Sequence, residues 1–149
     1  MKKILLSLLF LNSIVCFSQK NFTTDEFNSI TNNGEKWKKD IKFFMYGKYT
    51  KEDSLTVVKT INEFNDLIEI ITLKLVSDID SSNSVIYFLS DSEYIKLYPS
   101  SESGVRNSIG LTSKYFVFKD IVKSRVHIDI IECTKYHCTS STIIHEMFH

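Results

Sequence analysis

The run Val85-Ile86-Tyr87-Phe88 limits the fold of this chain most strongly, because it is apolar at every position. A strand with one face in solvent alternates apolar and polar side chains, whereas a strand covered on both faces does not. This run therefore predicts a central strand in a sheet that carries helices. A polar turn cluster at 78–83 separates it from a shorter apolar run at 73–76.

A long amphipathic helix is predicted before these two strands. Thr50 followed by Asp53 approximates a capping box, the usual signal for a helix start. Apolar side chains then recur every three or four positions, at Val57, Ile61, Phe64, Ile68 and Ile71. That spacing places them on one helix face, which we expect to pack on the sheet.

The remaining chain adds short β-prone runs and one further helix. Strands are predicted at 40–46, 73–76, 84–89, 115–118 and 125–131, with a short helix at 91–97 and a polar loop at 99–104. An early helix, several strands and a last helix together predict an α+β layered domain over residues 37–149. Residues 19–36, which show little periodicity, are expected to form a loosely ordered lead-in.

The first eighteen residues have the pattern of a secretory signal peptide. Lys2 and Lys3 precede an apolar stretch at 4–17, and cleavage is expected near Ser18/Gln19. The stretch is shorter than the roughly 20 apolar residues of a membrane span, so a secreted or periplasmic domain without a stable span is predicted. A retained N-terminal anchor and a lipoprotein modified at Cys16 are weaker alternatives.

The charge balance argues against nucleic-acid binding. The chain has 18 Lys+Arg and 18 Asp+Glu and lacks a basic run. Proteins that bind the phosphate backbone without sequence preference need clustered positive charge. A nucleic-acid partner is therefore not expected.

Two cysteines, Cys133 and Cys138, remain after signal cleavage. In an oxidising compartment they are predicted to form a short-range disulfide. A structural zinc site is the alternative, but it needs four ligands and His137 between the cysteines raises the total only to three. The disulfide is the favoured interpretation.

The chemistry-bearing motif lies at the end of the chain. His145-Glu146-Met147-Phe148-His149 follows the hydroxyl-rich triplet 140–142, which is expected to cap a helix. Residues four apart lie on one helix face, so His145 and His149 can share a zinc ion (Zn²⁺). Glu146 points about 100° away from His145 and is suited to take a proton from a metal-bound water.

With this motif the chain resembles a secreted member of the zincin superfamily of zinc metallopeptidases. The resemblance implies a twisted mixed sheet backed by an early helix, with zinc ligands at His145 and His149. It also implies Glu146 as general base, hydrolysis of peptide bonds, and a peptide or protein substrate paired with an edge strand. We expect that edge strand at Tyr115–Phe118.

The third zinc ligand of zincins comes from sequence after the motif helix, and this sequence ends at His149. The expectation is therefore a chain truncated after the motif, with impaired activity. His127 and His137 are the upstream alternatives; strand alternation places His127 on the polar face with Arg125 and Asp129, and solvent-facing histidines are commoner than ligands. A non-catalytic secreted binding module on the same fold is the alternative function.

Overall fold

The computed structural model describes residues 35–149, so the predicted signal peptide and nearly all of the lead-in lie outside the described residues. The strands are β1 (Lys36–Trp37), β2 (Ile41–Gly47), β3 (Leu73–Leu75), β4 (Ser84–Leu89), β5 (Gly110–Val117) and β6 (Asp120–Asp129). The α-helices are α3 (Lys51–Leu67), α4 (Asp91–Leu97), α5 (Glu102–Val105), α6 (Ile130–Tyr136) and α7 (Thr139–Met147). Two 3₁₀ turns, η2 (Ile79–Ser81) and η3 (Pro99–Ser101), complete the described elements.

The sheet is parallel except at one edge. Strands β6, β4, β2 and β3 lie side by side in that order and run parallel, and the short β1 also pairs in parallel with the start of β6. Strand β5 pairs antiparallel with β6 and forms the edge. The chain is thus a mixed α/β domain with a mainly parallel sheet. The predicted layering of helices on a sheet is confirmed, whereas the sequence analysis expected an α+β domain and did not predict that most strands run parallel.

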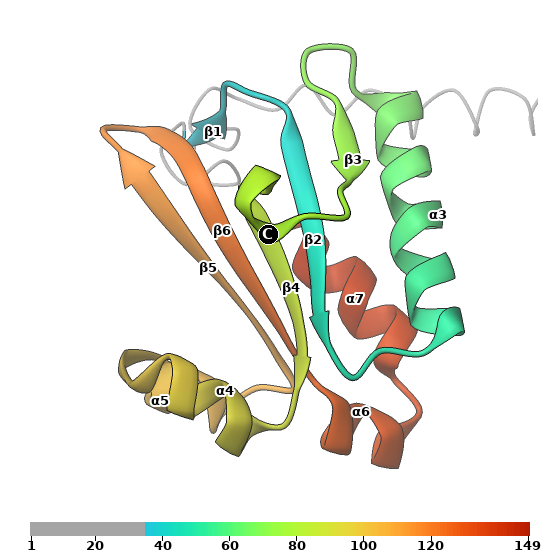
Figure 1. Ribbon diagram of the computed structural model, residues 1–149, viewed down its shortest axis with the longest axis vertical. Helices are drawn as coiled ribbons and strands as arrows, with labels where there is room; N and C mark the ends of the chain where they lie inside the picture. The colour runs from blue at the N-terminus through green and yellow to red at the C-terminus, as the bar shows by residue number, and fades with distance from the viewer. Residues whose placement is uncertain (1–34) are drawn as a thin grey trace, which may run out of the picture. The chain divides into compact units, whose positions relative to one another are not determined.

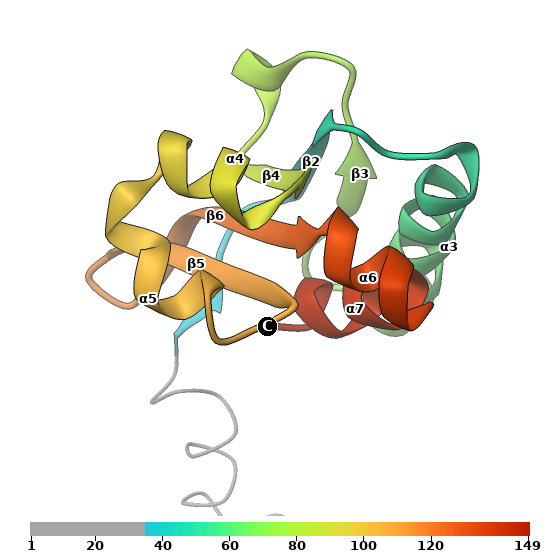
Figure 2. The same ribbon diagram turned by 90° about the horizontal axis from the view of Figure 1, so that it is seen from below.

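Helices cover both faces of the sheet (Figures 1 and 2). Strand β4 shows why: Ile86 and Phe88 belong to the core beneath α3 and α7, while Tyr87 and Leu89 belong to a second core beneath α4 and α5. All four side chains are buried. Apolar side chains on both faces of one strand require both helix layers.

The long helix ends earlier than the apolar spacing predicts. Its capping box is present, because Thr50 and Asp53 bond each other's backbone amides. Ile68 is already extended, however, and Ile71 lies beyond the helix. The side chain of Asn65 explains this stop, since it bonds both the amide and the carbonyl of Leu73 and draws the chain into β3.

Two predicted segments and one predicted orientation were wrong. Residues 99–104 are largely helical, in η3 and α5. Ile130 and Ile131 begin α6 instead of extending the strand, because the Asp129 carboxylate accepts from the amides of Ile131 and Glu132 and caps the helix. His127 is fully buried rather than on a polar face, since α4 covers that side of β6 and Tyr94 stacks on its ring.

None of the helices in the described part of the chain is long and apolar enough to cross a membrane.

The packing of α7 can be tested at two adjacent isoleucines. Ile143 is 0 % exposed and belongs to the main core, whereas Ile144 is 40 % exposed. We expect Ile143→Ala to lower the free energy of unfolding by about 2–5 kcal/mol, because it leaves a cavity between α7 and the sheet. Ile144→Ala is the matched control and should lower it by less than about 1 kcal/mol. Equal effects in urea unfolding would show that α7 is not anchored through this face.

Candidate functional site

Helix α7 follows α6 through a tight turn. His137 ends α6 in the left-handed conformation, with φ 53°, and Cys138 precedes the first turn of α7. The predicted cap was therefore wrong: α7 has no side-chain cap, and Ser141 and Thr142 instead lie inside it, where their hydroxyls donate to the Cys138 carbonyl. The compact turn moves the helix start upstream of the hydroxyl-rich triplet.

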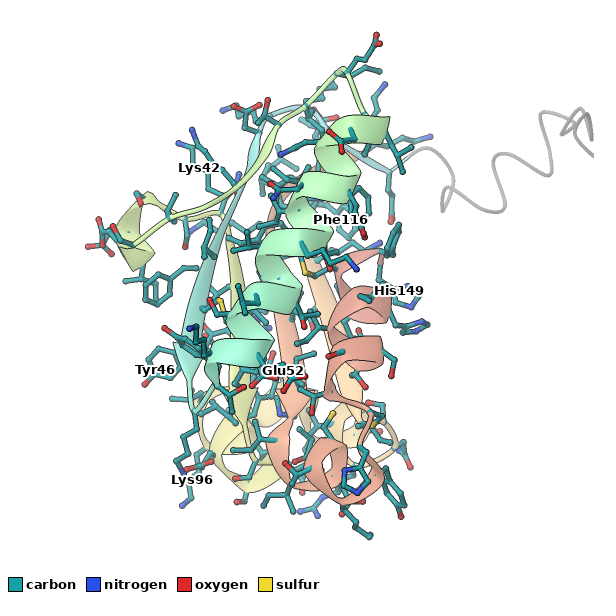
Figure 3. All side chains as sticks on the ribbon, turned by 90° about the vertical axis from the view of Figure 1, so that its right-hand side faces the viewer. Lys42, Tyr46, Glu52, Lys96, Phe116 and His149 are labelled. Atoms are coloured by element: carbon teal, nitrogen blue, oxygen red, sulfur yellow. The ribbon has the colours of Figure 1, made fainter. Side chains whose placement is uncertain are left out.

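The two motif histidines meet on the outer side of α7. Nε2 of His145 and Nε2 of His149 are 3.0 Å apart, and the ring planes are nearly perpendicular. Both side chains are exposed, and His149 lies at the outer end of α7 in Figure 3. Two nitrogen ligands of a tetrahedral zinc ion lie about 3.3 Å apart, so the pair is already near the spacing that chelation needs.

Glu146 faces the opposite way, toward the sheet, and is only 7 % exposed. Oγ1 of Thr112 on β5 lies 2.8 Å from both the Oε2 and the backbone carbonyl of Glu146, and its single hydrogen is shared between these two acceptors. Gly110 makes room for the Glu146 side chain, because a Cβ there would lie 2.7 Å from the Glu146 Cγ. The sequence pattern found neither Gly110 nor Thr112, since their role depends on strand pairing that brings residues 34 or more positions away under the helix.

A small cavity connects these groups. Glu146, His149, Thr112 and Lys114 all border a space of about 30 Å³ between the end of α7 and the sheet. A cavity needs about 10–15 Å³ to hold one water molecule. The space is therefore large enough for one water molecule.

No third ligand completes the histidine pair. Residues 35–149 contain no group of three His, Cys, Asp or Glu side chains that could hold a metal ion. His127 points to the other face of the sheet, where Nε2 bonds the Leu89 carbonyl and burial lowers its pKa. His137 is exposed at the turn before α7. The structure thus brings together His145 and His149, places Glu146 on the opposite, sheet-facing side of α7, and leaves out both upstream histidines.

The cysteines are close together and free. Cys133 is buried in the main core and its Sγ donates to Oγ1 of Thr142 at 3.6 Å. Burial is the main cause that raises its pKa to about 12, so it is a poor nucleophile at neutral pH. The disulfide with Cys138 stays a prediction.

A second polar cluster, which the sequence analysis did not find, lies where β4 and β6 end. Asp91 and Asp129 border a hollow of about 590 Å³ together with Glu132 and Arg106. Burial, followed by the negative charge and hydrogen bond of Asp129, raises the pKa of Asp91 to about 6. A neighbouring negative charge disfavours the ionised form of a partly buried carboxyl group, so the Asp91 side chain holds its proton to higher pH than a free one.

Comparison with protein-family models, with characterised proteins and with solved structures found no match for this chain. What the site can do is therefore inferred from its own geometry.

The support of Glu146 by β5 can be tested at Thr112. Thr112→Val keeps the shape but removes the hydroxyl, and leaves a buried carboxylate without its donor. We expect a loss of about 1.5–3 kcal/mol in the free energy of unfolding at neutral pH. Thr112→Ser keeps the hydroxyl and should recover most of that loss. If the valine and serine variants unfold at the same urea concentration, the hydrogen bond is not stabilising.

The raised pKa of Asp91 predicts a pH-dependent stability. The folded-state pKa is raised from 3.8 to about 6, so this group stabilises the fold at low pH and loses that contribution as the pH rises through this interval. Asp91→Asn should therefore raise the free energy of unfolding at pH 7 by about 1 kcal/mol, because water partly screens the charges at this site. Near pH 4 the substitution should change it little. Asp66→Asn, on the exposed side of α3, is the control and should show no such pH-dependent gain. Thermal unfolding between pH 4 and 7 measures both.

Proposed function

We propose that this chain is a zincin-type zinc metallopeptidase domain, with His145 and His149 as metal ligands and Glu146 as general base. The observation that carries the proposal is the 3.0 Å approach of the two Nε2 atoms, with His145 in the last turn of α7 and His149 just after the helix ends at Met147. In a hydrogen bond between two imidazoles one Nε2 donates and the other accepts, and zinc would need both Nε2 atoms without a proton. Bound zinc would supply an activated water and polarise a substrate carbonyl.

The remaining roles, metal binding, proton transfer and positioning of the base, belong to side chains of this chain. His145 and His149 would hold the metal, and Glu146 would take a proton on its carboxylate and later release it to the leaving amine. Thr112 holds that carboxylate in place through Oε2, and Glu146 borders the small cavity at the end of α7. A general base must lie within hydrogen-bond reach of the proton that it takes, and the cavity provides that reach.

Strand β5 supports the substrate side of the proposal. It pairs with β6 and with no other strand among residues 35–149, so one of its edges is free for an extended peptide. Thr112 and Lys114 of this strand border the same cavity as Glu146 and His149. The edge expected at Tyr115–Phe118 corresponds to the last part of β5, although Phe118 has φ 58° and lies in the turn that follows.

The alternative is a non-catalytic secreted binding module. Two observations favour it: residues 35–149 supply no third metal ligand, and the Glu146 carboxylate is bonded to Thr112 in a largely buried position. Under this alternative Glu146 is a structural group that holds α7 on β5. Catalysis and metal binding must therefore be measured separately.

The test measures zinc binding and peptide cleavage on the same proteins. Zinc should bind the wild-type chain, and His145→Ala or His149→Ala should weaken binding by about tenfold or more. Cleavage of an unstructured peptide library, with imidazole added as an exogenous third ligand, should depend on zinc and stop with a chelator. Glu146→Gln should reduce the rate by about 100-fold or more and leave zinc affinity nearly unchanged.

The outcomes separate the two functions. Zinc binding that requires both histidines, without cleavage under any of these conditions, would support the binding module. Cleavage that survives Glu146→Gln would contradict Glu146 as the base. His137→Ala is the matched histidine control and should change neither measurement.

A further inference from the structure

A second hollow, of about 400 Å³, lies on the face of the sheet opposite α7. Strand alternation creates it: Thr112 and Val126 point toward α7, while Tyr115 and Arg125 point to the other face. Lys123 of β6 and the ring of Tyr98, which follows α4, also border it. Its volume is within the range of small-molecule sites. It shares none of its lining residues with the histidine site.

The central group of this hollow is the guanidinium of Arg125. Its Cζ lies 3.8 Å from the ring centroid of Tyr98 and 4.8 Å from that of Tyr115. Aromatic rings cover the flat faces of a guanidinium and leave its N–H donors along the edge. The hydroxyl of Tyr98 is hydrogen-bonded to that of Tyr87 at 2.6 Å, and neither hydroxyl is hydrogen-bonded to Arg125.

Arg125 has no partner for these donors in the described structure. Its Nε is buried and unbonded, and neither Arg125 nor Lys123 forms an ion pair within residues 35–149. Removing a charged donor from water without a hydrogen-bond partner is unfavourable. A ligand that accepts from the guanidinium would relieve this.

The charges around the hollow indicate the kind of ligand. Arg125 and Lys123 contribute two positive charges, and Asp80 contributes one negative charge to the same border. The surplus is one positive charge, which matches a singly charged anion. The neighbouring tyrosine rings offer flat apolar surface for a planar ligand body.

We propose that this hollow binds a small organic acid that has one carboxylate and a planar apolar body. The carboxylate accepts two parallel hydrogen bonds from the guanidinium of Arg125, a geometry that this side chain fits well. Lys123 adds charge at the exposed rim, and the ligand body packs on the exposed side of the Tyr115 ring. This site is independent of zinc and of peptide cleavage.

Benzoate is the probe, and benzamide is its uncharged isostere. Both are titrated into the full chain with a chelator present, so that carboxylate binding to a metal cannot contribute. Benzoate should bind in the millimolar range or tighter and raise the unfolding temperature, whereas benzamide should do neither. Arg125→Gln should weaken benzoate binding by about tenfold or more. Arg106→Gln, which removes an exposed arginine paired with Glu102, is the matched control and should bind normally.

Lys123→Gln keeps the test decisive if the Arg125 variant does not fold, because Lys123 is exposed at the rim. It should unfold like the wild type and bind benzoate severalfold more weakly. Inorganic phosphate and acetate are the comparison anions. No benzoate binding, equal binding of benzamide, or tighter binding of phosphate than of benzoate would each overturn the proposal.

Discussion

The contact between α7 and strand β5 determines the geometry of the motif. Ile143 and Glu146 lie one turn apart on the inner side of α7, the first in the apolar core and the second against Gly110 and Thr112. With this side fixed, His145 points outward from the last turn of α7, and His149, just after the helix, comes within 3.0 Å of it. A helix that turned about its axis would separate the carboxylate from its donor and bury an imidazole. The same contact thus orients both histidines and the glutamate.

The alternation of side chains along β5 and β6 places the two hollows on opposite faces of the sheet. On one face of β5 and β6, Thr112 and Lys114 approach the end of α7. On the other face, Tyr115 and Arg125 border a separate hollow, and His127 is stacked beneath Tyr94. Since successive side chains of a strand point to opposite faces, neither site can take residues from the other without a bulge. The register of the β5–β6 pair shifts between Tyr115 and Phe116, where β6 has one extra residue, Val122, beyond the part of β5 that contacts Glu146.

Much of the fold could be predicted from local patterns, because those patterns act over a few residues. The apolar run in β4, the capping box of α3 and the short helix α4 depend on neighbours in sequence. The predictions were wrong where residues distant in the sequence determine the structure. Asn65 ends α3 by bonding β3, and the helix layer over β6 buries His127, which alternation alone placed in solvent.

The candidate site likewise has a part that the sequence predicts and a part that it does not. The pairing of His145 with His149 follows from helix geometry and could be predicted, whereas the supports of Glu146 could not. Thr112 is one hydroxyl among many, and Gly110 matters only because the helix crosses β5 at that point. Arg125 was noted as a strand residue, but its two tyrosine contacts come from β5 and from the segment after α4. Such groups become visible only when the sheet is assembled.

The central claim is that two imidazoles at the end of α7 chelate one metal ion through their Nε2 atoms. Nitrogen NMR of the four histidine side chains during a zinc titration tests it most directly. The account predicts that the Nε2 signals of His145 and His149 shift together with one common affinity, while those of His127 and His137 stay in place. A shift of only one motif histidine, or an equal response of His137, would contradict it.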